Sequence, residues 1–247
     1  MAGHSKWANI QYRKNAQDKR RGKIFTRLIR EITVATRMGG ADPDANPRLR
    51  LAIDKALGNN MPKDNIERAI KRGSGDADGQ EYDEVRYEGY GPGGVAILLE
   101  TLTDNRNRTV AEVRHTFSRH GGNLGADGSV AYLFSRSGVF HFDADTDDEL
   151  VLAVALEAGA EDIAEYDDGS FDVLTSPEEY QAVKQALAAA DFGCNEADVT
   201  MRAATTTELE GDLARQCLVL LDALEDLDDV QNVYSNADFA EEILQAE

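Results

Sequence analysis

The sequence predicts an α+β multidomain protein, in which an N-terminal three-helix bundle precedes two α/β ferredoxin-like domains, the third inserted in the second. Up to about residue 75, apolar residues recur at helical spacing, and after residue 80 strand-like segments alternate with helices. Residues 135–204 by themselves contain a complete β-α-β-β-α-β order, which is ferredoxin-like. The expected domains are therefore 1–78, then 79–134 together with 205–247, and the insertion 135–204.

Charge is divided unevenly along the 247 residues. The net charge is −20, yet residues 1–75 contain 17 Lys and Arg against 7 Asp and Glu, a net charge of +10. The remainder therefore carries −30. This division is typical of a polyanion-binding module on an acidic body. The alternative is a solvated charged bundle beside a solvated acidic domain.

The basic charge is densest in one predicted amphipathic helix, which begins near Lys19 and ends at Gly39-Gly40. At about 100° per residue, its apolar residues from Ile24 to Ala35 share one broad side. Only that side needs burial, so the opposite cationic stripe is expected to be free to bind phosphate. The stripe consists of Lys19, Lys23, Arg27, Arg30 and Arg37.

The segment before this helix adds further candidate contacts. His4, Ser5 and Lys6 are expected to be exposed and to reach into the nucleic acid. Trp7 is expected to anchor the core of the bundle, with stacking on a base as the alternative. The other basic residues of this segment are assigned to the same interface, namely Arg13, Lys14, Arg20 and Arg21.

Two more helices complete the predicted bundle. Asn46 is a plausible N-cap for the second helix, with Pro47 in its first turn, and Gly58 ends it. Pro62 opens the third helix and Gly73 closes it. This third helix extends the expected cationic surface through Lys71 and Arg72.

The second part begins with a predicted antiparallel pair, Val85 to Tyr90 and Val95 to Leu102. Between them, residues 89–94 (Gly-Tyr-Gly-Pro-Gly-Gly) match the dinucleotide-binding glycine pattern, which functions only where a strand turns into a helix. Both flanks are strand-like, so a hairpin turn is expected. A helix from about Arg108 to Gly121 and a short strand at 129–134 follow.

The expected insertion has strands at 139–142, 162–166, 171–174 and 197–201, and helices at 148–157 and 177–190. A helix with Leu209, Leu213 and Cys217 on one stripe and a last strand at 230–234 then complete the second domain. Asp143, Asp145 and Asp147 begin like a calcium loop, but the positions that follow do not fit one, so they are expected to cap a helix.

The segment from Asp104 to Thr109 (Asp-Asn-Arg-Asn-Arg-Thr) leaves two interpretations open. It is either a helix start, capped by Asp104 or Asn107 with solvated arginines, or a second phosphate contact. In the second interpretation Arg106 and Arg108 bind the anion beside exposed helix amides.

Several other classes of protein are disfavoured. Cys194 and Cys217 form neither a disulfide framework nor a zinc spacing, and no apolar run approaches the length of a membrane span. No signal-peptide pattern opens the chain. No nucleophile–base set is recognisable. We therefore expect a cytoplasmic protein that is not an enzyme and has no cofactor, metal, membrane or small-molecule partner.

Several stretches resemble the YebC family over essentially the full length. They are Gly3 to Ile10, Arg21 to Phe25, Asp42 to Arg50, Ile66 to Ile70, Tyr87 to Pro92 and Thr103 to Thr109. The resemblance implies a helical bundle and two α/β domains, the third inserted in the second. Bacterial members are described as probable transcriptional regulators that bind DNA. Mitochondrial relatives act as translational activators, and some bacterial members are associated with ribosomes and relief of stalling. The family has no established catalytic residues or cofactor.

Charge and resemblance together predict a non-enzymatic, nucleic-acid-binding regulator of gene expression, in the first place a DNA-binding transcriptional regulator. One alternative is a ribosome- or RNA-binding translation factor. Another is a protein-interaction scaffold, and the acidic domains are in any case candidates for a basic protein partner.

Overall fold

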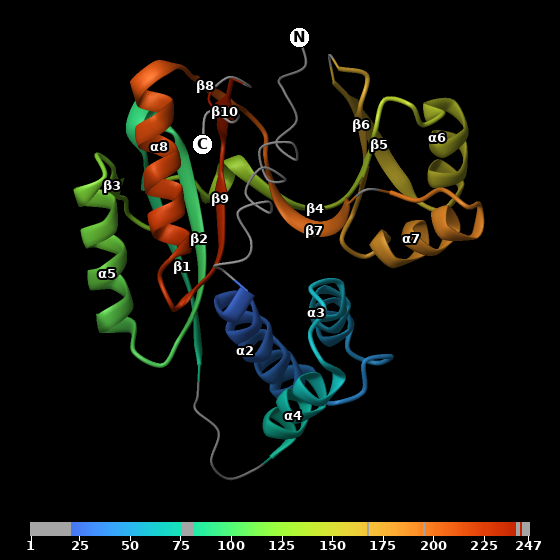
Figure 1. Cartoon of the computed structure of the whole chain (residues 1–247), viewed down its shortest axis with the longest axis horizontal. Helices are drawn as coiled ribbons and strands as arrows, with labels where there is room; N and C mark the ends of the chain where they lie inside the picture. Colours follow the sequence, from blue (N-terminus) through green and yellow to red (C-terminus); the bar gives the residue numbers. More distant parts are fainter. Residues whose placement is uncertain (1–20, 76–81, 167, 195, 241–242, 244–247) are drawn as a thin grey trace.

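The computed structural model describes residues 21–75, 82–166, 168–194, 196–240 and 243. In this part of the chain, a three-helix bundle lies beside two antiparallel sheets, each of which carries two helices on one face (Figure 1). The predicted fold class is confirmed. No helix in the described part is long and apolar enough to cross a membrane.

The bundle consists of α2 (Arg21–Gly39), α3 (Pro47–Gly58) and α4 (Lys63–Ser74). Helix α2 ends where Gly40 adopts a φ of 90°, a conformation that favours glycine. As predicted, Asn46 caps α3, because its side chain accepts a hydrogen bond from the Leu49 amide at 3.1 Å. The amide group of Asn46 also donates to the Ala35 carbonyl at 2.8 Å, which ties α3 to α2. The core between the helices includes Ile32, Ala35, Leu49, Met61 and Ile66.

The second domain contains the predicted hairpin, β1 (Asp83–Tyr90) and β2 (Ala96–Thr103). The tight turn between them has positive φ at Gly93 and Gly94, and no helix follows it. The glycine pattern is therefore a hairpin turn. With β3 (Asn123–Leu124) and β9 (Val230–Ser235), the sheet has the order β3-β1-β2-β9. Helices α5 (Arg106–Arg119) and α8 (Gly211–Glu225) pack on one face through a shared apolar core.

The prediction of a strand at 129–134 is wrong. A short 3-10 turn, Ala131–Leu133, occupies this place, and β4 starts only at Phe134. The cause is the buried carboxylate of Glu88, which accepts the amides of Gly128, Val130 and Ala131 at 2.6–2.7 Å. Those amides are then not available to a neighbouring strand. Burial alone would raise the pKa of Glu88, but the three amides outweigh it and hold the pKa below its usual value.

The insertion contains β4 (Phe134–Phe142), α6 (Asp148–Glu157), β5 (Ala160–Glu165), β6 (Phe171–Thr175), α7 (Tyr180–Ala189) and β7 (Glu196–Ala203). Its sheet has the order β5-β6-β4-β7, which is the ferredoxin-like order that the sequence predicts. Stacked pairs, Phe140 on Tyr180 and Phe142 on Phe171, fill the space beneath the helices. Asp147 caps α6 by accepting the Leu150 amide, as expected.

Three short strands were not predicted, namely β3 and two that pair with each other near the end of the chain. β8 (Thr207–Leu209) pairs in parallel with β10 (Ala237–Phe239), so Leu209 lies in a strand and α8 begins only at Gly211. Strands of two or three residues are too short to show the alternation on which strand prediction depends.

Candidate nucleic-acid interface

Helix α2 carries the predicted cationic stripe, and its apolar side is buried as expected. Ile32 and Ala35 lie in the bundle core, with Phe25, Leu28 and Ile29 partly buried beside them. The orientation of the helix that periodicity predicts is therefore correct.

The opposite side of α2 contacts the second domain, at the C-terminal end of α8 and the turn after it. Lys23 Nζ donates to the Asp226 carbonyl oxygen at 2.9 Å and to its carboxylate at 3.2 Å. Arg27 donates to the Glu225 carbonyl oxygen. The last carbonyl groups of a helix lack intrahelical donors and carry the negative end of its dipole, so cations are favoured there.

Arg30 makes the most extensive of these contacts. Its Nη1 donates to the carbonyl oxygens of Asp228 at 2.9 Å and Leu102 at 3.1 Å, and lies 3.5 Å from the carboxylate of Asp229. The guanidinium also lies over the Tyr82 ring, 5.1 Å from its centroid. The Arg30 side chain is only 14% exposed, so it belongs to the domain interface.

The expectation of a free stripe is therefore wrong for Lys23, Arg27 and Arg30. Periodicity placed them correctly on the side away from the bundle core, but that side is covered by another domain. Their assignment to nucleic acid stays a prediction. At the far end of the helix, Arg37 is exposed.

Asp229 connects this interface to the predicted second phosphate contact. It is 3% exposed and accepts hydrogen bonds from Arg108 at 2.7 Å, Thr109 at 2.7 Å and Thr103 at 3.1 Å. Burial alone would raise its pKa, but these donors outweigh burial and hold the pKa of Asp229 below its usual value. The cluster formed by Arg30, Thr103, Arg108, Thr109 and Asp229 is called the Asp229 cluster below.

The segment from Asp104 to Thr109 is a helix start, as the first interpretation has it, but its arginines are not simply solvated; the second interpretation, a phosphate contact, stays a prediction. Asn105, not Asp104 or Asn107, caps α5 by accepting the Arg108 amide at 3.1 Å. Arg108 also pairs with Asp104 at 2.8 Å. Arg106 pairs with Asp83 at 2.8 Å, which lowers the pKa of that carboxyl group. The arginines are thus neither merely solvated nor unpaired.

Helix α4 keeps its cations exposed. Lys63, Lys71 and Arg72 are exposed, and within the described part of the chain none of them has a hydrogen-bond or ion-pair partner. Arg68 is exposed too, and its hydrogen bonds to described residues lie within its own helix, to Asp64 and Asn65. The helix lies at the lower edge of Figure 1, away from both sheets. Lys71 and Arg72 therefore match the predicted interface best.

Other predicted interface residues lie outside the described part: His4, Ser5, Lys6, Arg13, Lys14, Lys19 and Arg20. The same holds for Trp7 and for the side chain of Arg21, whose backbone opens α2. Their assignments stay predictions.

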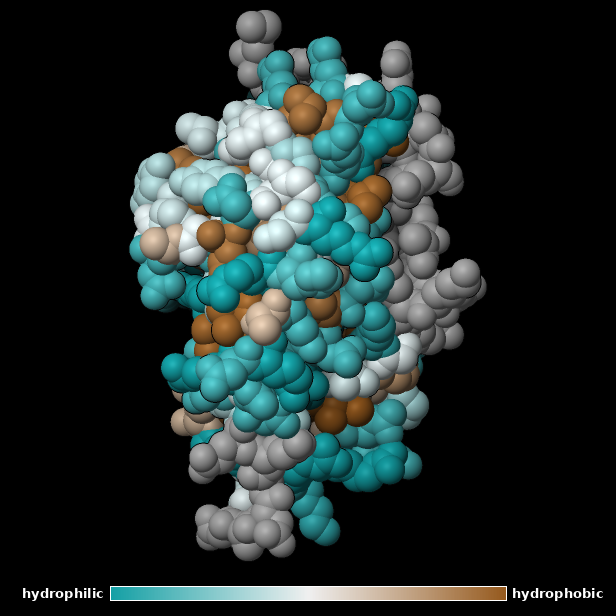
Figure 2. All heavy atoms as spheres, turned by 90° about the vertical axis from the view of Figure 1, so that its left-hand side faces the viewer, coloured by the Kyte–Doolittle hydropathy of each residue, from teal (hydrophilic) through white to brown (hydrophobic). Residues whose placement is uncertain are grey.

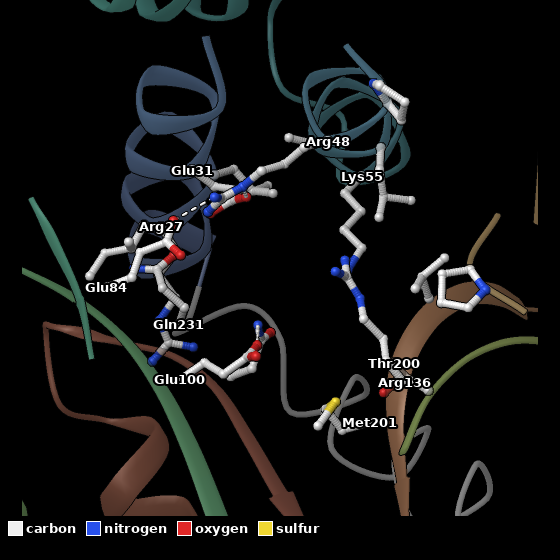
Figure 3. A pocket seen from close by; sticks show the side chains of 18 of the residues that line it. Arg27, Glu31, Arg48, Lys55, Glu84, Glu100, Arg136, Thr200, Met201 and Gln231 are labelled. Carbon is white, nitrogen blue, oxygen red and sulfur yellow. Dashed lines mark hydrogen bonds and ion pairs between the residues drawn. The ribbon is translucent and has the colours of Figure 1, made fainter. Parts of the chain in front are cut away.

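A cavity of about 1100 Å³ lies where the bundle meets both sheets (Figure 3). Arg48 of α3 bridges the domains here, with its Nε 2.7 Å from Glu31 of α2 and a further contact to Glu84 of β1. Arg86 pairs with Glu100 at 3.2 Å. Figure 3 shows Arg136 extending from β4 into this space. Sequence patterns gave no signal for the cavity, because its walls come from segments far apart in the chain.

The bundle is also attached to the insertion. Lys55 of α3 pairs with Asp198 of β7 at 2.8 Å, and Lys184 of α7 pairs with Asp54 of α3 at 3.2 Å. Leu51 packs partly buried against the core of the insertion. The bundle is thus held by polar contacts to both of the other domains.

No group of three or more His, Cys, Asp or Glu side chains within the described residues could hold a metal ion. A histidine–carboxylate pair of the kind found in catalytic sites lies in the insertion: His141 Nδ1 is 2.7 Å from Asp172 Oδ1, and Asp172 also accepts from the Tyr166 hydroxyl. His141 is only 6% exposed and Asp172 only 1%. A pair closed off from solvent in this way has a structural role rather than access to a substrate.

This pair predicts a pH dependence of stability. The hydrogen bond to Asp172, with its charge, raises the pKa of His141 above the usual 6.5 despite burial. A raised folded-state pKa stabilises the protein fully below about pH 6.5, and this stability is lost as pH rises through the raised value. The free energy of unfolding of the native chain relative to His141→Gln, measured by urea titration, should therefore fall as the pH rises above about 6.5. A difference that stays constant over that range would contradict this role.

The fold and its charges define a class: a three-part α+β protein in which a basic helical bundle is attached to two acidic domains. The chain belongs to the TACO1/YebC family. The family model described as the TACO1/YebC protein N-terminal domain matches residues 5–76, and the one described as the TACO1/YebC second and third domain matches residues 82–237.

Relatives with names that describe a function match over nearly the whole length. A probable transcriptional regulatory protein of Methylococcus capsulatus is 66% identical over 244 residues, covering 99% of this chain and 98% of the relative. Another from Nitrosococcus oceani is 62% identical with the same coverage. The crystal structure of a conserved hypothetical protein from Aquifex aeolicus matches with a TM-score of 0.79 at 49% identity, over 92% of this chain and 94% of that one.

Proposed function

We propose that this protein is a non-enzymatic regulator of gene expression that binds nucleic acid through its N-terminal domain, in the first place DNA in transcription. Relatives that are 62–66% identical are named probable transcriptional regulatory proteins, which supports the regulatory role. The observation that carries the nucleic-acid contact is a set of exposed cations on α4 that have no partner among the described residues, namely Lys63, Lys71 and Arg72.

The proposed mechanism is electrostatic docking. Lys71 and Arg72, with Arg68 beside them, displace counterions from phosphates. The acidic domains are repelled by the same polyanion, because residues 76–247 carry a net charge of −30. Contact is then confined to the bundle. The basic segment that precedes α2 adds its charge to the same domain.

The test is the double reversal Lys71→Glu/Arg72→Glu, with binding of labelled duplex DNA measured by fluorescence anisotropy over a range of salt concentrations. Removal of two phosphate contacts should weaken binding at least about tenfold near 100 mM salt, and should lower the slope of log affinity against log salt by about 2. Both side chains are exposed, so the fold should persist.

The matched control is Arg114→Glu/Arg119→Glu on α5. These arginines are also exposed, and within the described residues they have no hydrogen-bond or ion-pair partner. The change in net charge is the same, so this variant should bind almost as the native chain does. An equal loss of DNA affinity in the two variants would show that net charge, and not the α4 surface, governs binding.

A second candidate function, binding of RNA in translation, is favoured by the chemistry of α4. Its exposed cations are lysines and arginines suited to phosphates, while the one amide of this face, Asn65, is held by Arg68. Such a face positions a backbone without reading bases, which suits a ribosomal RNA as well as DNA. Competition between unlabelled ribosomal RNA and duplex DNA for the labelled complex separates the two functions.

A further inference from the structure

Helix α6 of the insertion is apolar all the way round between its charged ends. Residues 150–156 read Leu-Val-Leu-Ala-Val-Ala-Leu, without a polar side chain. Only Val151 and Ala155 are buried, whereas Leu150 is 56% and Leu156 50% exposed, and Ala153 between them is also exposed. A helix that is hydrophobic on every side is normally covered on every side.

The neighbouring helix shows that exposed leucines are not a general property of the helices of this domain. Helix α7 packs on the same sheet face through Tyr180, Val183 and Leu187. Its exposed residues are Gln185 and three alanines, so no large apolar side chain faces solvent there. Of the two helices in this layer, only α6 therefore presents leucines to solvent, and Figure 1 shows it at the outer edge of the molecule.

The exposed apolar side of α6 is framed by carboxylates. At about 100° per residue, Glu149 and Glu157 fall on the same side as Leu150, Ala153 and Leu156, one at each end. Asp147 and Asp148 precede them, and bond only to backbone amides of the first turn. None of the four acids forms an ion pair with any described residue, and all are exposed. Residues 135–204 as a whole contain 17 acidic and three basic residues, a net charge of −14.

We propose that the outer side of α6 is a docking surface for a basic amphipathic helix of a partner protein. The leucines would be covered by the apolar side of that helix, and its lysines or arginines would pair with Glu149, Glu157 and the two aspartates. Amphipathic helices bind apolar surfaces through residues spaced three and four apart, and complementary charges at the rim fix orientation and speed association.

The same charges argue against two other occupants. A second copy of this chain, packed α6 against α6, would bring the acids of both helices together without a counter-charge. Anionic membrane surfaces attract basic segments and would repel this one. Charge complementarity therefore selects a cationic partner. The surface lies on the insertion and α4 on the bundle, so this inference does not depend on the proposed nucleic-acid contact.

The test uses the full chain and a labelled synthetic helical peptide with leucines on one side and lysines on the other. Leu150→Gln/Leu156→Gln should weaken binding about tenfold or more, because two partly buried leucine contacts are lost. The matched control is Leu213→Gln/Val219→Gln, which changes residues of α8 that are 49% and 48% exposed. This variant should bind the peptide as the native chain does. Figure 2 shows how apolar side chains are distributed over one face of the molecule.

A second pair of variants tests the rim. Glu149→Gln/Glu157→Gln should weaken binding and reduce its salt dependence, while Lys71→Glu/Arg72→Glu should leave peptide binding unchanged. The inference is overturned if a scrambled peptide of the same composition binds equally well, or if the leucine variant binds like the native chain. Sedimentation that shows a dimer lost in Leu150→Gln/Leu156→Gln would also overturn it, because a second copy would then cover α6.

Discussion

Replacing Asp229 with alanine is expected to destabilise the protein by about 3 kcal/mol, since removing one partner of a buried ion pair leaves the other uncompensated. Asp229 is 3% exposed and accepts from Arg108, Thr109 and Thr103, with Arg30 at 3.5 Å. This expected loss of stability is at the lower end of the usual range for breaking a buried ion pair, because the Arg108 side chain is 43% exposed and can be hydrated once Asp229 is gone. Urea unfolding measures the change.

The control for this prediction is Asp226→Ala, in the same turn. Its carboxylate is 57% exposed and pairs with Lys23, itself 46% exposed, so its loss should cost less than about 1 kcal/mol. If both variants lose the same stability, the Asp229 cluster does not hold the interface together.

The triple reversal Lys23→Glu/Arg27→Glu/Arg30→Glu is expected to release α2 from the second domain. Three carboxylates would then face the carbonyl oxygens at the end of α8 and the carboxylates of Asp226 and Asp229, and these oxygens would lose every donor that α2 supplies. The bundle would stay attached through α3, by the ion pairs Lys55–Asp198, Asp54–Lys184 and Arg48–Glu84. Small-angle X-ray scattering should show a larger radius of gyration.

If the cations of α2 were free, as the sequence predicts, the same reversal would abolish nucleic-acid binding without changing the structure. The control is Lys63→Glu/Lys71→Glu/Arg72→Glu, with three reversals on the exposed side of α4. It should leave the radius of gyration unchanged. Equal expansion in both variants would mean that added negative charge, and not loss of the α2 contacts, opens the protein.

Local signals predicted the elements well. Asn46 and Gly40 mark helix ends through capping and positive φ, and the spacing of Ile32 and Ala35 fixed the buried side of α2. The hairpin at Gly93-Gly94 follows from strand-like flanks on both sides. Each of these depends on residues a few positions apart, which is the range over which sequence patterns carry information.

Partners distant in sequence were not predictable. Periodicity shows that Arg30 lies opposite the bundle core, but not that Asp229, 199 residues later, lies there too. In the same way, the pairing of Arg106 with Asp83 depends on the packing of α5 beside β1. The proposed interface is therefore on α4 and not on α2, because tertiary contacts decide which cations are available to a ligand.

The most direct test of whether α4 or α2 binds nucleic acid is lysine reactivity, measured by acetylation and mass spectrometry with and without nucleic acid. If α4 is the phosphate-binding surface of the described part, Lys71 should react readily in the free protein and be protected in the complex. Lys23, held by Asp226, should change little. Protection of Lys23 with no change at Lys71 would contradict the account, and would place the nucleic acid on α2.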